Sequence, residues 1–102
     1  MHSICMYAEK TSKRPAPSVK ELIQENAHEN KDVILAYLKS FEPIAYAPGV
    51  MRDAINGNRI PGAMFCASDG EYEWQTEEIY YFEKYNIKLN EDFIAHVLSK
   101  VK

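Results

Sequence analysis

The chain has 102 residues, a formal net charge of −3, and 46% hydrophobic and 26% charged residues. Because chains divide into separate domains only beyond roughly 250 residues, this length predicts a single domain over residues 1–102. The composition excludes an intrinsically disordered chain, which combines low hydrophobicity with high charge. The acidic balance disfavours nucleic-acid binding, which needs a basic surface that displaces counterions.

The cysteines and the distribution of apolar residues indicate in which cellular compartment the protein is expected. The two cysteines, Cys5 and Cys66, lack the dense spacing of a secreted disulfide framework. No uncharged stretch is long enough to span a bilayer, and residues 43–51, one of the longest, contain two prolines and a glycine. The first residues lack the basic and then apolar pattern of an export signal. We therefore expect a soluble, cytoplasmic protein without a membrane segment.

The amino-terminal region predicts an arm followed by a short helix. Residues 9–18 are polar and basic and contain two prolines, which disfavour helix. Residues 1–17 are therefore expected to form a loose arm or an edge strand. Ser18 and Glu21 have the spacing of a capping box, so a short helix should begin at Val19.

A second helix is predicted over residues 31–40, with Asn30 as its cap. Residues 44–47 are apolar and too short for another helix, so a strand fits them best. The evidence for the helix is its apolar residues, which recur at i, i+3, i+4 and i+7, the spacing of one buried helical face: Ile34, Tyr37, Leu38 and Phe41.

Two tight turns predict hairpins in the middle of the chain. Asn56-Gly57 tolerates the positive φ of a hairpin turn and is flanked by residues 50–55 and 59–60. A second turn, at Asp69-Gly70, separates a strand over residues 63–67 from one over residues 71–75. Aromatic and polar side chains alternate in the second of these strands, which predicts one core face and one solvent face.

Two helices complete the chain. Thr76 is the expected cap of a helix that ends near Asn86, and Asn90 is the expected start of a terminal helix. The order of elements and the short turns predict an α+β fold, with a small antiparallel sheet of three to five strands flanked by N-terminal and C-terminal helices. The apolar stripe of the terminal helix is formed by Phe93, Ile94, Val97, Leu98 and Val101.

Motifs for metal, nucleotide and nucleophilic chemistry are scarce. The histidines and cysteines are scattered without ligand spacing, and the glycines are separated at turns, so we expect neither a metal nor a cofactor. A cysteine and a histidine can form a nucleophilic pair, and Cys66 and His96 are the candidates if the chain is an enzyme. A cysteine in an apolar strand is otherwise an inert core residue.

The segment from Asp69 to Asp92 carries eight acidic and two basic residues, a local charge of −6, interleaved with aromatic residues. Such a patch attracts a basic protein partner and anchors it through aromatic side chains. Alternatively, these acids only stabilise two helix starts and keep the surface solvated. The candidate partner-binding residues are Asp69, Glu71, Glu73, Trp74, Glu77, Glu78 and Tyr81.

Residues 68–98, SDGEYEWQTEEIYYFEKYNIKLNEDFIAHVL, resemble small bacterial immunity proteins of toxin systems, including contact-dependent growth inhibition. The resemblance covers about a third of the chain and rests on structural motifs: the Asp69-Gly70 turn, the strand through Trp74, the tyrosine-rich helix and the helix that opens at Asn90. It implies a non-catalytic protein that binds and neutralises a cognate toxin, for example a basic nuclease. The alternatives are a small regulatory or adaptor domain that binds another protein, and a Cys/His-dependent enzyme.

Overall fold

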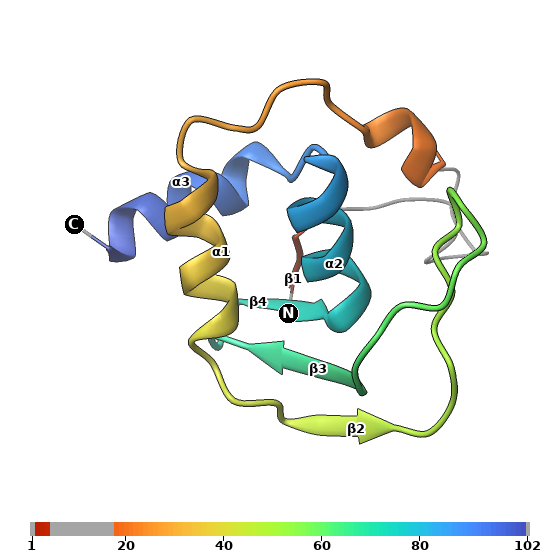
Figure 1. Ribbon diagram of the computed structural model, residues 1–102. Coiled ribbons are helices and arrows are strands. Elements are labelled where there is room, and N and C mark those ends of the chain that lie inside the picture. Colours follow the sequence, from red (N-terminus) through yellow and green to blue (C-terminus); the bar gives the residue numbers. More distant parts are fainter. Residues whose placement is uncertain (1, 5–17, 102) are drawn as a thin grey trace.

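The structure is a computed structural model that describes residues 2–4 and 18–101 (Figure 1). Most of the expected arm, residues 1–17, and with it Cys5, lies outside the described residues. Within the arm, residues His2–Ser3 form strand β1, which agrees with the edge-strand alternative for that part of the chain.

Four strands of the described residues form one sheet with the order β1-β4-β3-β2. The other strands are β2 (Ala45–Ala47), β3 (Met64–Ser68) and β4 (Tyr72–Gln75). With three described α-helices beside this sheet, the expected α+β fold is confirmed. The sheet is mixed rather than wholly antiparallel, because β1 pairs with β4 in parallel while the other two pairings are antiparallel. β1 reaches β4 from far along the chain, so no tight turn dictates its direction.

In the described part of the chain, four helical segments accompany the sheet: the 3₁₀ turn η1 (Val19–Leu22), α1 (Lys31–Lys39), α2 (Thr76–Tyr85) and α3 (Glu91–Lys100). The capping box of η1 is present, since the Glu21 Oε2 atom accepts from the Ser18 N–H at 2.8 Å. The second helix, α1, ends one residue before its predicted limit. The predicted end of α2 is also confirmed, because Asn86 adopts a left-handed conformation with φ of 55°.

The cap of α2 differs from the prediction. Gln75 occupies the cap position, and the Glu78 carboxylate accepts from the Gln75 N–H at 3.1 Å. The hydroxyl of Thr76 instead bonds β3, where it accepts from the Phe65 N–H at 2.9 Å and donates to the Ala63 carbonyl oxygen at 2.9 Å. The Thr76 hydroxyl, which the local sequence predicted as a helix cap, therefore binds the backbone of the β3 segment instead.

The predicted hairpin at Asn56-Gly57 is only partly formed. The turn is present, with a Gly57 φ of +76°, but its flanks form a single bridge between Arg52 and Arg59 rather than two strands. The carboxylate of Asp53 explains the difference, because it accepts from the backbone N–H groups of Ile55 and Asn56 and folds the segment around itself.

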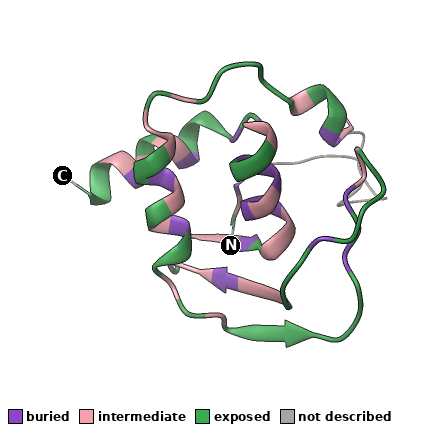
Figure 2. Cartoon of the chain, viewed as in Figure 1, coloured by how far each residue is buried: buried purple, intermediate pink, exposed green. Residues whose placement is uncertain are grey.

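The strand register divides the sheet into a covered and an open face. Ala67 and Trp74 are opposite each other and fully buried, and the Trp74 ring contacts rings of α1 and α3, including Phe93. The exposed fraction of the side chains falls toward this centre (Figure 2). Because successive side chains of a strand point to opposite faces, the side chains of β2, β3 and β4 that alternate with those of the covered face form the other face of the sheet, and none of them is buried. We call this the open face; it consists of Ala45, Ala47, Met64, Cys66, Ser68, Glu73 and Gln75.

Candidate functional site

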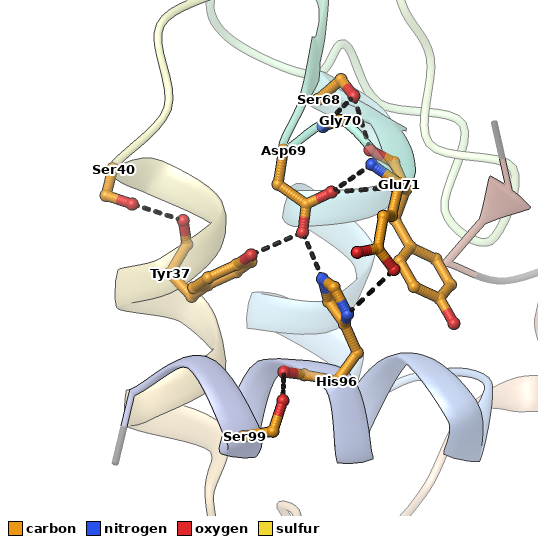
Figure 3. Close-up of polar contacts among 9 residues, drawn as sticks. Tyr37, Ser40, Ser68, Asp69, Gly70, Glu71, His96 and Ser99 are labelled. Atoms are coloured by element: carbon orange, nitrogen blue, oxygen red, sulfur yellow. Dashed lines mark hydrogen bonds and ion pairs between the residues drawn. The ribbon is translucent and has the colours of Figure 1, made fainter.

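Asp69, at the β3–β4 turn, lies at the centre of a polar cluster that joins three elements (Figure 3). Its Oδ2 atom accepts from the Tyr37 hydroxyl of α1 at 2.5 Å and lies 2.6 Å from Nε2 of His96 in α3. Its Oδ1 atom accepts from the backbone N–H groups of Glu71 and Tyr72, each at 2.9 Å. The turn, α1 and α3 are thereby held to one carboxylate.

The electrostatics of this cluster favour an ionised Asp69. Burial acts to raise the pKa of Asp69, but the hydrogen bonds from Tyr37, from two backbone N–H groups and from His96 together hold it well below its usual range. Burial and the bond to Asp69 raise the pKa of Tyr37 above its ordinary value. The cluster therefore pairs a carboxylate with a neutral phenol.

His96 is engaged on both sides of its ring. In addition to the Asp69 contact, its Nδ1 atom lies 3.5 Å from Glu71 Oε2, and its side chain is 11% exposed. A general base needs a ring nitrogen within reach of the substrate proton. Both nitrogens of His96 instead face carboxylates of the protein, which suits a structural role in holding the turn against α3.

Cys66 and His96 do not form a nucleophilic pair. Cys66 points to the open face of the sheet, because it is opposite Gln75 and alternates with the buried Ala67. His96 packs against the covered face, with its ring centroid 4.8 Å from that of Tyr72. The sheet separates the two side chains, so the expectation of an enzyme that uses this pair is not supported by the geometry.

Four of the candidate partner-binding residues are in the interior. Trp74 is 0% exposed, Glu78 is 0% exposed and Tyr81 is 1% exposed, while the Asp69 side chain is 3% exposed. Their roles are internal: ring packing for Trp74, helix capping for Glu78, and for the Tyr81 hydroxyl a bond from the Ala54 N–H at 2.9 Å. The expectation that these side chains form a contiguous binding surface is wrong, since alternation and helical periodicity turned them inward.

The remaining three carboxylates are accessible but do not lie on one face. Glu71 has a 64% exposed side chain beside His96, whereas Glu73 is half-buried on the open face. Glu77 is half-buried in the first turn of α2, where it lines a cavity next to β2. The acidic segment therefore divides into separate surfaces, and of these three carboxylates Glu77 is the one that lines the cavity beside β2.

Asp53 forms a second buried polar cluster that the sequence did not predict. The side chain is 1% exposed, and its Oδ2 atom accepts from the Tyr80 and Tyr85 hydroxyls of α2, each at 2.7 Å. Burial acts to raise the pKa of Asp53, but these bonds and two from backbone N–H groups lower it. The available signal was an acidic residue inside the apolar segment that leads to the Asn56-Gly57 turn.

The most exposed large hydrophobic residues among those described lie at the β2 edge of the sheet. β2 is exposed along its length (Figure 2), and large apolar side chains around it are exposed by 61% for Ile44, 69% for Tyr46 and 55% for Val50. A cavity of about 160 Å³ adjoins it, with walls from Met51, Met64 and Phe65 and with Glu77 among its polar groups. We call this edge and its cavity the β2 surface; it comprises Ile44, Ala45, Tyr46, Ala47, Val50 and the cavity residues.

Comparisons with known proteins give no relative. No family model matches the chain, and neither the curated proteins nor the solved structures include a significant match. Among residues 2–4 and 18–101, no group of three His, Cys, Asp or Glu side chains is placed to hold a metal ion, and no helix has the length and apolarity needed to cross a membrane.

A second cavity, of about 380 Å³, lies away from the β2 surface, between the segment after η1, the α2–α3 connection and α3. Its walls include Phe82, Ile94 and Leu98, with Lys88 and Glu91 among the polar residues. The adjacent positive and negative side chains give this cavity no single charge preference.

Proposed function

We propose that the chain is a non-catalytic protein-binding module of the immunity type, which binds and neutralises a basic partner such as a cognate toxin. The observation that carries the proposal is the β2 surface, where Ile44, Tyr46 and Val50 are exposed around the edge of the sheet. Large exposed apolar surfaces of soluble proteins commonly serve an interaction, and these three residues are the most exposed large hydrophobic residues described. Interfaces combine such an aromatic and aliphatic centre with a polar rim.

The charge of the rim supports a basic partner. Glu77 lines the cavity beside β2, Glu42 is exposed just before the strand, and the net charge of the chain is −3. Complementary charge steers association and suppresses wrong partners. The resemblance of residues 68–98 to immunity proteins supports the same proposal. So does the separation of Cys66 from His96, which removes the catalytic pair that the sequence suggested.

The test begins with purification of the tagged chain from its host and identification of a protein that binds at equal stoichiometry. That protein, expressed alone, should arrest growth, and co-expression of the chain should restore it. Glu77→Gln should weaken binding by about tenfold, as expected for loss of one interfacial ion pair. The matched control is Glu83→Gln, because Glu83 is an exposed carboxylate of the same helix that pairs with Lys39 at 2.9 Å.

The readouts separate the two binding functions. A partner that is inactive in the complex and recovers when released supports the immunity function. A stoichiometric partner that stays fully active in the complex would contradict it and would favour the regulatory or adaptor alternative. Equal weakening by Glu77→Gln and Glu83→Gln would remove the β2 surface as the binding site.

A further inference from the structure

Among the described residues, no strand pairs with the outer edge of β2, where the backbone groups of Tyr46 lie. In the antiparallel β2–β3 pair, Tyr46 is opposite Phe65. The Phe65 N–H donates to the Thr76 hydroxyl at 2.9 Å, and that hydroxyl lies 3.3 Å from the Phe65 carbonyl oxygen, so both backbone groups of Phe65 point away from β2. The Tyr46–Phe65 pair is therefore of the non-hydrogen-bonded type, and the N–H and C=O groups of Tyr46 point to the free edge.

The neighbouring residue agrees with this assignment. The carbonyl oxygen of Cys66 accepts from the Ile44 N–H at 2.9 Å, so the backbone groups of Cys66 face β2. Because the direction alternates along a strand, those of Phe65 must face the other side. In the described part of the chain, β2 pairs only with β3, which leaves the outward groups of Tyr46 for another strand.

The edge lacks charged protection but is limited in length. Natural edge strands are guarded by charged side chains, prolines, bulges or shortness. Residues 43–51 carry no charge, whereas Pro43 and Pro48 bracket the strand. The prolines restrict pairing to the few residues between them, so a partner strand must gain further affinity from its side chains.

The cavity shows which side chain fits. It is lined by all three residues of β2, by the apolar side chains of Met51 and Met64, and by Glu77. A strand paired with Tyr46 would run beside this cavity. A long aliphatic stem that ends in a cation matches apolar walls with a carboxylate, as Lys and Arg side chains do. A second copy of this chain cannot supply that cation from the same edge, because residues 43–51 contain no basic residue.

We propose that the partner adds an extended strand to β2 through the backbone of Tyr46 and places an Arg or Lys side chain in the adjoining cavity against Glu77. This inference rests on the proposed function and specifies how the partner is held. Strand addition supplies affinity through main-chain hydrogen bonds, and the pocket beside the edge supplies specificity.

The probe is a synthetic seven-residue peptide, Thr-Val-Thr-Arg-Thr-Val-Thr, and a second peptide in which citrulline replaces Arg. Tyr46→Pro removes the outward N–H donor and no donor that the sheet uses, while Tyr46→Thr removes the ring and keeps the donor. By NMR titration, the Arg peptide should bind Tyr46→Pro at least tenfold more weakly than Tyr46→Thr. Circular dichroism and thermal unfolding of both variants establish that they are folded.

Three results would overturn the inference. Equal binding to folded Tyr46→Pro and Tyr46→Thr, or no binding to the unsubstituted chain at millimolar peptide, would exclude strand addition. Equal binding of the Arg and citrulline peptides, or a preference that survives Glu77→Gln, would exclude the cation in the cavity. A dimer in sedimentation that Tyr46→Pro dissociates would assign the edge to a second copy. If growth protection persists despite any of these results, the proposed function stands with a different mode of binding.

Discussion

Asp69 and His96 join the β3–β4 turn to α3 through a contact of 2.6 Å between Oδ2 and Nε2. Because the same Oδ2 atom accepts from the Tyr37 hydroxyl, one carboxylate oxygen fixes two helices that are distant in sequence. Asp69 therefore connects the β3–β4 turn to both α1 and α3, and its replacement should lower the stability of the fold.

Replacement of Asp69 should be strongly destabilising. Asp69→Ala removes four acceptor contacts and leaves the His96 ring and the Tyr37 hydroxyl without their buried partner, which should lower the free energy of unfolding by about 3 kcal/mol. Urea unfolding followed by circular dichroism measures the change. Glu71→Gln is the control, because that side chain is 64% exposed and should cost less than about 1 kcal/mol. Equal costs for the two variants would contradict the role of Asp69.

Acid should destabilise the fold through Asp69 and Asp53. The pKa of each carboxyl is lower in the folded protein than its ordinary value, so the unfolded chain binds more protons at low pH. Their contribution is complete above the ordinary Asp range, near pH 4, and is lost as the pH falls below it. Thermal unfolding between pH 7 and pH 3 should show this loss, and the slope should be smaller in Asp69→Asn. An unchanged slope in that variant would exclude Asp69 as a source.

Alkali should destabilise the fold through two tyrosines. Burial and the bond to Asp69 raise the pKa of Tyr37, and the bond to Asp53 together with burial raises that of Tyr85. The unfolded chain therefore loses these protons first, and stability should fall as the pH rises past about 10, the ordinary tyrosine value. Unfolding by urea at pH 8 to 11 measures the fall. Tyr37→Phe and Tyr85→Phe should each reduce the pH dependence, and the prediction fails if both retain it.

Trp74 should report on the state of the core. It is the single tryptophan, it is 0% exposed, and its Nε1 atom has no hydrogen-bond partner among the described residues. Its fluorescence should be blue-shifted in the folded protein and protected from iodide, and should shift to the red on unfolding. Trp74→Leu should cost about 3 kcal/mol by opening a cavity among Phe41, Tyr37 and Phe93. Efficient quenching of the folded protein by iodide would contradict the burial.

Local signals in the sequence predicted much of the secondary structure. Helix α1, the Asp69-Gly70 turn, the end of α2 near Asn86 and the start of α3 after Asn90 all follow from residues within a few positions of one another. Caps, turns and helical periodicity act over such distances, so the sequence contains them directly.

Features that depend on distant partners were missed. The Thr76 hydroxyl bonds β3 instead of capping α2, and the Asp53 carboxylate replaces a regular hairpin with a loop held by tyrosines of α2. Strand alternation predicted a core face for the aromatic residues of β4, Trp74 among them, whereas the burial of Tyr81 depends on how α2 packs against the rest of the fold. At the candidate site, the strand over residues 44–47 was predicted, but its place at an edge depends on the strand order β1-β4-β3-β2, which no local pattern specifies.

The parallel pairing of β1 with β4 also bears on when the domain can fold during synthesis. The backbone carbonyl oxygen of Ile4, a residue that is 0% exposed, accepts from the Asn90 N–H at 2.8 Å, and His2 is opposite Tyr72. On the ribosome, β1 therefore cannot pair until β4, residues 72–75, has emerged from the exit tunnel, and the bond to Ile4 cannot form before residue 90 has emerged. Contacts of such high sequence separation form slowly and late, so the sheet is completed only after about three quarters of the chain has been translated.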